Sequence, residues 1–238
     1  MPFPAQRATA YLVAENQPIT ASNATFGQKT LNAYKLAAQT IVTNELLFDN
    51  AFDLENFIIT DFADALASKE EDLFINGTGA NQPTGILTTA AADLTMIQQT
   101  VGANIAADDL LNLVYKLPRP YRKNAVFLVN DATLAAIRKL KDANQAYMWQ
   151  PSFEAGEPDR LLGYPVYTSP YMPTIAAGEM VLAFGDFSNY VIGDRGQRTF
   201  QQLNELYAPN FCTGYIITER VDGVLLVNQA VRVLQIKP

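Results

Sequence analysis

The chain has 238 residues, of which 49% are hydrophobic and 17% charged, and its net charge is −7. This composition allows one large domain or two smaller ones with buried cores, and no stretch approaches the roughly 18 apolar residues of a membrane span. The chain has no histidine and only one cysteine, Cys212. This excludes Ser-His-Asp and Cys-His catalysis, an internal disulfide, and most zinc and non-haem iron sites.

The N-terminal part predicts strands. Residues 1–16 carry no apolar run after Arg7, so they do not form a signal peptide, and we expect a soluble, cytosolic protein. Residues 9–30 alternate strand-like and turn-rich segments, which predicts a two-stranded excursion that is marginal by itself. Residues 31–43 continue as a strand, although their mixed periodicity also fits a helix.

A long amphipathic helix follows, from about Asp53 to Ile75, with a length of roughly 35 Å. Its apolar residues recur at three- and four-residue spacings: Leu54, Phe57, Ile58, Phe62, Ala65, Leu66, Leu73 and Phe74. Its other face is acidic, with Glu55, Asp61, Asp64, Glu70 and Glu71. Asn76 and Gly77, which tolerate a left-handed backbone, are expected to end it.

The next stretch, FINGTGANQPTGIL (residues 74–87), looks like a phosphate-binding glycine loop. In a dinucleotide fold, however, the glycines follow a strand, whereas here they follow a helix. Gln82 stands where a third glycine belongs, and no Gly-Lys-Ser/Thr sequence follows. The pattern therefore favours a helix end and a turn at 83–85.

The rest of the chain alternates between helices and strands. Helices are predicted over 106–118, which Pro118 and Pro120 end, and over 131–143, with Asp131 as N-cap. A buried strand is predicted over 125–130 and two more within 180–194, so residues 106–195 form an α/β layer. Strands are also expected over 199–207 and 213–221, with a tight turn at Asp222-Gly223 before the last strands. The first and last parts of the chain could share one sheet.

Charges of opposite sign gather in two stretches, acidic over 45–72 and basic over 116–141. They are either solvated faces or complementary patches that meet between copies of the chain. The contact candidates from these stretches are Glu70, Glu71, Arg119, Arg122 and Lys123. The aromatic segment with Tyr147, Trp149 and Phe153 is either a core-facing loop or a further contact loop.

Several stretches together resemble, in order and spacing, the major capsid proteins of tailed bacteriophages and prophages, whose fold is shared with encapsulins. They are TNELLFDN (43–50), EEDLFINGTGANQPTGIL (70–87), NAVFLVNDATLAAIRKLKDANQAYMWQPS (124–152), LLGYPVYTSPYMP (161–173), LAFGDFSNYVIGDR (182–195) and RVDGVLLVNQAVRVL (220–234). The resemblance covers nearly the whole chain from about Val13.

The resemblance implies an α+β fold with a long spine helix. An extended two-stranded loop would span 8–30, a peripheral domain 31–105 and 196–238, and an inserted α/β axial domain 106–195. The breaks between predicted elements fall at the same places.

The resemblance implies a structural role and no enzymatic activity, cofactor or metal. Copies of the chain would form the pentamers and hexamers of an icosahedral virion head that encloses double-stranded DNA without sequence-specific binding. Further implied partners are a scaffolding segment, a protease and a portal, with no membrane. The subunit would stay in the host cytoplasm before assembly. The alternative is the shell of an encapsulin-like compartment.

The chain departs from the family pattern in two ways. Family members usually carry an N-terminal arm, whereas this chain begins almost at the extended loop, so we expect the arm to have been removed. Some members join neighbours through a Lys–Asn isopeptide bond with a buried Glu as proton acceptor. The expected loop tip has no lysine, and Lys29, Asn210 and Glu219 are only approximate counterparts, so we expect no crosslink.

A carboxylate-based enzyme is the remaining alternative, with Asp108-Asp109 or Glu70-Glu71-Asp72 as its acids. Adjacent residues of a helix point in different directions, so neither set converges on one reacting centre. The composition and this geometry both favour the structural role.

Overall fold

The computed structural model describes residues 2–6, 10, 12–13, 15, 25–49, 53–102, 104–141 and 160–238. Three predictions fall wholly or partly outside these residues. They concern the strand expected at the start of 9–30, the end of the helix expected over 131–143, and the segment with Tyr147, Trp149 and Phe153.

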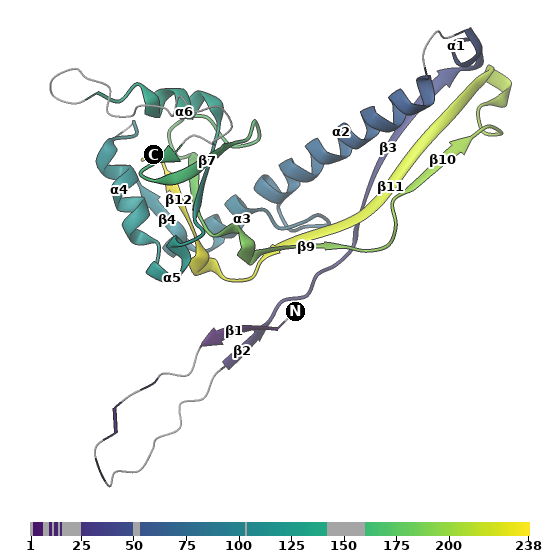
Figure 1. The fold of residues 1–238 in the computed structure, drawn as a ribbon. Coiled ribbons are helices and arrows are strands. Elements are labelled where there is room, and N and C mark those ends of the chain that lie inside the picture. The colour runs from purple at the N-terminus through teal and green to yellow at the C-terminus, as the bar shows by residue number, and fades with distance from the viewer. Residues whose placement is uncertain are drawn as a thin grey trace.

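The described chain forms an elongated arm, a compact body and a short hairpin that projects from them (Figure 1). The arm contains β3 (Tyr34–Thr43), α1 (Asn44–Asp49), α2 (Leu54–Asn76), β9 (Tyr190–Asp194), β10 (Thr199–Leu203), η3 (Ala208–Asn210) and β11 (Cys212–Leu225). The hairpin pairs β1 (Pro2–Gln6) with β2 (Thr25–Gln28) in antiparallel fashion.

The sheet of the arm is antiparallel and centred on β11, the longest described strand. β3 and β10 flank one part of β11, and β9 pairs with its C-terminal part. Burial alternates along β3 because one face of the sheet lies under α2 while the other is open. The strand prediction for 31–43 is thus right and its helical alternative wrong. The first and last parts of the chain share this sheet, as predicted.

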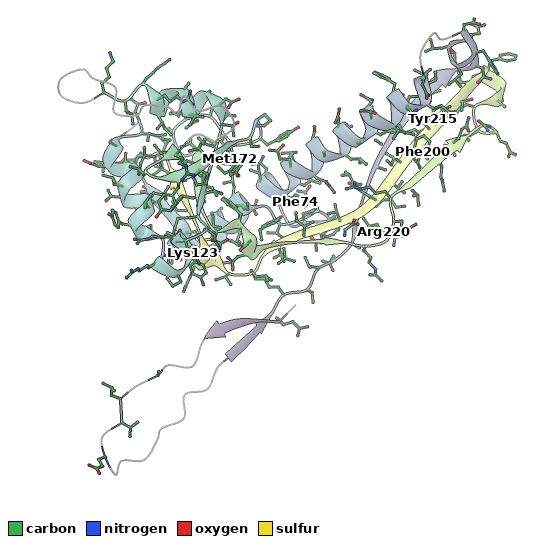
Figure 2. All side chains as sticks on the ribbon, viewed as in Figure 1. Phe74, Lys123, Met172, Phe200, Tyr215 and Arg220 are labelled. Carbon is green, nitrogen blue, oxygen red and sulfur yellow. The ribbon has the colours of Figure 1, made fainter. Side chains whose placement is uncertain are left out.

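The predicted long helix is confirmed as α2, with 23 residues. Asp53 caps its first turn by accepting a hydrogen bond from the Asn56 amide at 3.2 Å. One stripe of α2 is buried against Tyr215 and Ile217 of β11. It recurs every fourth residue at Leu54, Ile58, Phe62 and Leu66. Figure 2 shows Tyr215 and Phe200 in this outer part of the arm, where their rings stack with centroids 5.7 Å apart.

The end of α2 differs from the prediction. Gly77 has φ −53°, so it does not adopt the expected left-handed backbone. Glycine is needed there because a Cβ atom would lie 2.3 Å from the carbonyl oxygens of Leu73 and Pro83. Within the loop the amides of Gly79 and Gly85 bond to the carbonyls of Pro83 and Gly77, at 3.1 and 2.8 Å. These internal hydrogen bonds occupy amides that an anion-binding site would need. The loop is followed by α3 (Ile86–Ala92), a helix that the sequence did not predict.

The body is built on a mixed sheet with the order β4-β12-β8-β5-β7-β6. Its strands are β4 (Ile97–Gln99), β12 (Val231–Gln235), β8 (Met180–Gly185), β5 (Val126–Val129), β7 (Tyr164–Thr168) and β6 (Arg160–Leu161). The other elements are α3, α4 (Ala107–Lys116), α5 (Arg119–Arg122), α6 (Asp131–Arg138), η1 (Leu94–Met96), η2 (Phe187–Asn189) and η4 (Asn228–Ala230).

The central strands β8 and β12 are buried along nearly their whole length, as their apolar sequences predict. The core of the body contains Phe127 and Phe184, whose ring centroids are 4.4 Å apart, with Tyr164 packed edge-on against Phe184 at 5.0 Å. Met172, labelled in Figure 2, is fully buried in a second cluster where α3 meets the sheet.

Two local predictions are corrected. The N-cap of α6 is Asn130, whose side chain accepts from the Ala132 amide at 3.0 Å, and Asp131 is the first helical residue. Asp222 and Gly223 form no turn, because both lie inside β11. There they pair with Gly193 and Ile192 of β9. Gly223 is needed there because a Cβ atom would lie 2.3 Å from the Tyr190 hydroxyl. Glycine inside a strand often marks a site where another group approaches the backbone closely, as the Tyr190 side chain does here.

The strand pairings bear on the expected domain boundaries. β9 lies within the expected axial segment 106–195 but pairs with β11 of the arm. β12 lies within 196–238 and β4 within 31–105, yet both belong to the sheet of the body. The division into domains stays a prediction, and both sheets contain strands from more than one of its segments.

Candidate functional site

The exposed side of α2 is strongly acidic. Between Leu54 and Asn76, six carboxylates against Lys69 alone leave a formal charge of −5. Lys69 is already paired with Asp72 at 2.7 Å. This bond, together with one from Asn76, lowers the pKa of Asp72. The exposed carboxylates that remain include Asp61, Asp64 and Glu71. They form an anionic surface along the arm.

Glu70 lies differently, because it faces Glu219 of β11 across the helix–sheet interface. Glu219 is only 4% exposed, and its Oε2 accepts a hydrogen bond from Arg198 Nε at 2.6 Å. Arg198 also lies 3.9 Å from the Glu70 carboxylate. Burial, followed by the hydrogen bond and charge of Glu219, raises the pKa of Glu70 to about 7. Among the described residues Glu219 Oε1 has no hydrogen-bond donor unless Glu70 is protonated.

The two contact candidates of α2, Glu70 and Glu71, therefore lie in different surroundings. The carboxyl of Glu71 points to solvent, whereas that of Glu70 meets groups of its own chain. This difference follows from helix geometry, because consecutive residues are rotated by about 100°. As a site for another copy, the exposed Glu71 is the stronger candidate.

Some side chains of the basic segment 116–141 already bind groups of their own chain. Arg122 donates to the carbonyls of Leu117 and Tyr115, each at 2.7 Å, and its guanidinium lies 5.1 Å from the Tyr115 ring centroid. Lys116 donates to the carbonyl of Ile97 at the edge of the sheet. Arg119 and Lys123, by contrast, are exposed at the rim of the body, where Figure 2 labels Lys123.

A second cationic cluster was missed by the sequence reasoning. Lys35 and Arg220 are paired across β3 and β11, and the Arg195 amide bonds to the Arg220 carbonyl at 3.0 Å. All three side chains are exposed around a hollow of about 260 Å³. No sequence signal could have found this cluster, because strand pairing alone unites residues so distant in the chain.

The chain that follows β2 of the hairpin is anchored on β11. Lys29 donates to the Leu225 carbonyl at 2.5 Å, and burial lowers the pKa of this lysine. The Asp222 carboxylate, 5% exposed, accepts from the amides of Asn32 at 2.5 Å and Gly223 at 2.8 Å. These bonds fix where the chain leaves the arm toward β2.

The same contacts bear on the approximate counterparts of the crosslinking groups. Lys29 is bonded to its own β11, and Glu219 is bonded to Arg198. Asn210 lies in η3 at the far end of the arm, before the start of β11. Both Lys29 and Glu219 are thus engaged within the chain. That no isopeptide bond forms stays a prediction.

The described residues contain no group of three or more His, Cys, Asp or Glu side chains that could hold a metal ion. No helix in the described part of the chain is long and apolar enough to cross a bilayer.

The model of the phage capsid family matches residues 1–236, and the chain belongs to this family. By family and by the names of its relatives it is a capsid shell protein, which is structural and not enzymatic. The resemblance seen in the sequence is thereby confirmed, as is the α+β phage capsid fold.

Two curated relatives carry the name major capsid protein. The protein of Escherichia phage T5 is 26% identical over 201 residues, covering 80% of this chain and 43% of the relative. That of Klebsiella oxytoca phage phiKO2 is 25% identical over 207 residues, covering 82% and 47% respectively. The chain thus spans about half the length of the curated relatives it matches.

Solved structures agree with these relatives. The capsid of a native GTA particle, determined with C5 symmetry, has a TM-score of 0.87 and 31% identity over 100% of this chain and 84% of that chain. Mycobacterium phage Adephagia gives a TM-score of 0.76 at 18% identity, and an encapsulin from Synechococcus elongatus gives 0.65 at 16%, so both support the fold alone. The structural relatives include multi-subunit capsid shells.

Proposed function

We propose that this chain is the subunit of an icosahedral phage or prophage head, which assembles as pentamers and hexamers and encloses double-stranded DNA. The observation that carries the proposal is the match over the entire chain to a GTA capsid, at 31% identity. The open faces of the arm support it as well, because a subunit of a shell must present surfaces that only other copies cover. The virion is its proposed location, and the host cytoplasm its location before assembly.

Size-exclusion chromatography with negative-stain microscopy tests this function. We expect closed shells or capsomer-sized rings of the purified chain. A strictly monomeric chain under all assembly conditions would contradict the proposal.

The encapsulin-like compartment is the second candidate. The fold of an encapsulin supports it, but with a lower TM-score, 0.65 against 0.87. The two functions differ in their contents. Particles that carry a co-purified enzyme would favour the compartment, whereas particles that package DNA would favour the phage head.

Contacts with DNA are proposed to be weak and independent of sequence. A chain of net charge −7 releases few counterions on binding a polyanion. A fluorescence polarisation titration with duplex DNA at physiological salt should show no binding. An affinity in the micromolar range would count against this part of the proposal.

Charged surfaces are proposed to set the register between copies. The anionic surface of α2, which includes Glu71, would face cations of a neighbour such as Arg119, Arg122 and Lys123. Glu70 is proposed as a second member of this contact, next to Glu71 on α2, although it also meets Arg198 and Glu219 of its own chain. The exposed members of this set, Glu71, Arg119 and Lys123, allow a sharp test. Glu71→Lys should impair assembly, and Lys123→Glu in the same chain should restore it in part. A double variant no better than Glu71→Lys would remove this pairing from the proposal.

The remaining partners and contacts are proposals from the family resemblance. Tyr147, Trp149 and Phe153 are proposed as a contact loop of the axial domain, and a scaffolding segment, a protease and a portal as transient or terminal partners. The domain division into 8–30, 31–105 with 196–238, and 106–195 is proposed on the same ground.

A further inference from the structure

The far end of the arm exposes large aromatic side chains. Phe48 of α1 is 86% exposed, and Phe211, between η3 and β11, is 77% exposed. Leu206 and Leu46 add further exposed apolar surface at the same end, where Figure 1 shows α1 beside the outer turns of the sheet. Single exposed apolar residues are ordinary, but a group of them on one end of a chain marks a surface for contact.

Phe211 is held in a conformation that a large side chain rarely adopts. Its φ and ψ are 53° and 38°, in the left-handed region that favours Gly or Asn. The backbone is fixed on both sides, since Phe211 N donates to the Ala208 carbonyl at 3.1 Å and Phe211 O accepts from the Asn44 amide at 2.9 Å. The turn would form more easily with a smaller residue, and the ring contributes little burial in return. A strained residue that displays its side chain points to a function outside the fold.

A hollow of about 590 Å³ lies beside these residues. Its apolar lining includes Leu47, Phe48, Leu54 and Tyr215, and polar groups such as Asn44 and Glu55 line it as well. It is large enough to receive an aromatic side chain. The end of the arm therefore carries both a protruding ring and a receiving hollow, which is what a contact between identical copies requires.

We propose that this end of the arm is a copy-to-copy contact in which Phe211 of one subunit enters the hollow beside Phe48 of another. The proposal rests on the proposed shell function and adds to it the residues that join the arms. An aromatic anchor in a desolvated pocket is the usual energetic centre of a protein interface. The left-handed turn pre-orients the ring, so little side-chain entropy is lost on contact.

The decisive variant is Phe211→Asn, because Asn tolerates the left-handed turn and removes the ring. We expect the unassembled subunit to unfold at an unchanged temperature or about 2–4 °C higher. We expect the subunit concentration needed for assembly to rise at least tenfold. Loss of assembly without loss of stability cannot be produced by misfolding.

Leu162→Asn is the matched control. Leu162 also has φ 53° and is an exposed apolar residue, 46% exposed, but it lies in the turn between β6 and β7 of the body. Its replacement should leave assembly unchanged. Wild-type assembly by Phe211→Asn, or an equal loss by Leu162→Asn, would overturn the proposal.

Sedimentation velocity of the concentrated subunit separates this contact from the shell function. Wild type that forms shells while Phe211→Asn also does so refutes the contact and keeps the function. Wild type that forms no shells but self-associates through Phe211 keeps the contact and refutes the function. A wild-type chain that never self-associates refutes both. Maleimide labelling of Cys212, which lines the hollow, should be slower in wild-type oligomers than in Phe211→Asn.

Discussion

The arm and the body of this chain reach stability in different ways. The body surrounds its central strands with helices and buries two large hydrophobic clusters. In the arm, one stripe of α2 packs against one face of a sheet. The buried cluster at this contact contains six of the residues that the structure describes. A region that leaves its other faces open is only half of a packed structure. Under the proposed shell function, neighbouring subunits would supply the missing half, and we propose the arm as the region adapted to assembly.

Truncation of buried aromatic rings should show this difference most strongly. Phe127→Ala in the body should lower the free energy of unfolding by about 3–5 kcal/mol, because it leaves a cavity in a rigid core. Phe62→Ala in the arm should cost about half as much, because the half-open layer around Phe200 can collapse into the space. Urea unfolding measures both. Equal losses would show that the arm is packed as rigidly as the body.

Asp222 should give the next largest effect, because it ties the hairpin to the arm. Asp222→Ala leaves the amides of Asn32 and Gly223 without their acceptor and should cost about 2 kcal/mol. Hydrogen exchange should rise at residues 25–32 and change little in the body. Asp222→Asn, which keeps one acceptor oxygen, is the control and should lose less. A uniform rise of exchange through the body would contradict a local anchor.

Glu70 should make the stability of the arm depend on pH. Its pKa is raised from an ordinary value of 4.5 to about 7 in the folded chain, so the folded state binds this proton more tightly. The resulting stabilisation is complete below pH 4.5 and is lost as the pH rises through about 7. Glu70→Gln, which can donate to Glu219 at any pH, should stabilise the chain at pH 8 by about 1 kcal/mol, after allowance for solvent screening, and have little effect at pH 4.

Urea unfolding of Glu70→Gln at the two pH values tests this expectation. Glu71→Gln, one residue further along the same helix and exposed, is the control and should change stability little at either pH. An identical effect of Glu70→Gln at both pH values would show that the pKa of Glu70 is not raised in the folded chain.

The smallest effect on stability should come from the exposed cations of the body. Arg119→Glu combined with Lys123→Glu should change the free energy of unfolding by less than about 0.5 kcal/mol, because neither side chain is buried. Assembly should nevertheless weaken if these cations face the acidic α2 of a neighbour. Full assembly by the double variant would leave the arm, and not the rim of the body, as the main contact region.

The candidate contact residues could be predicted only in part. Glu71, Arg119 and Lys123 are exposed, as a contact requires, because charged side chains are rarely buried without a partner. Arg122 could not be separated from them by sequence, because its hydrogen bonds go to backbone carbonyls at the end of the preceding helix, α4. Phe211 gave no signal either, since a left-handed turn at a phenylalanine contradicts every local preference.

The sequence by itself determined the elements whose physics is local. The apolar spacing of α2 and the apolar runs of β5 and β8 follow from side-chain periodicity within a few residues. Only the tertiary structure decided that Gly223 lies inside a strand, that Glu70 faces Glu219, and that Lys35, Arg195 and Arg220 meet. Each of these features depends on which distant segment packs alongside, and that choice is made by the burial of whole faces and not by any one residue.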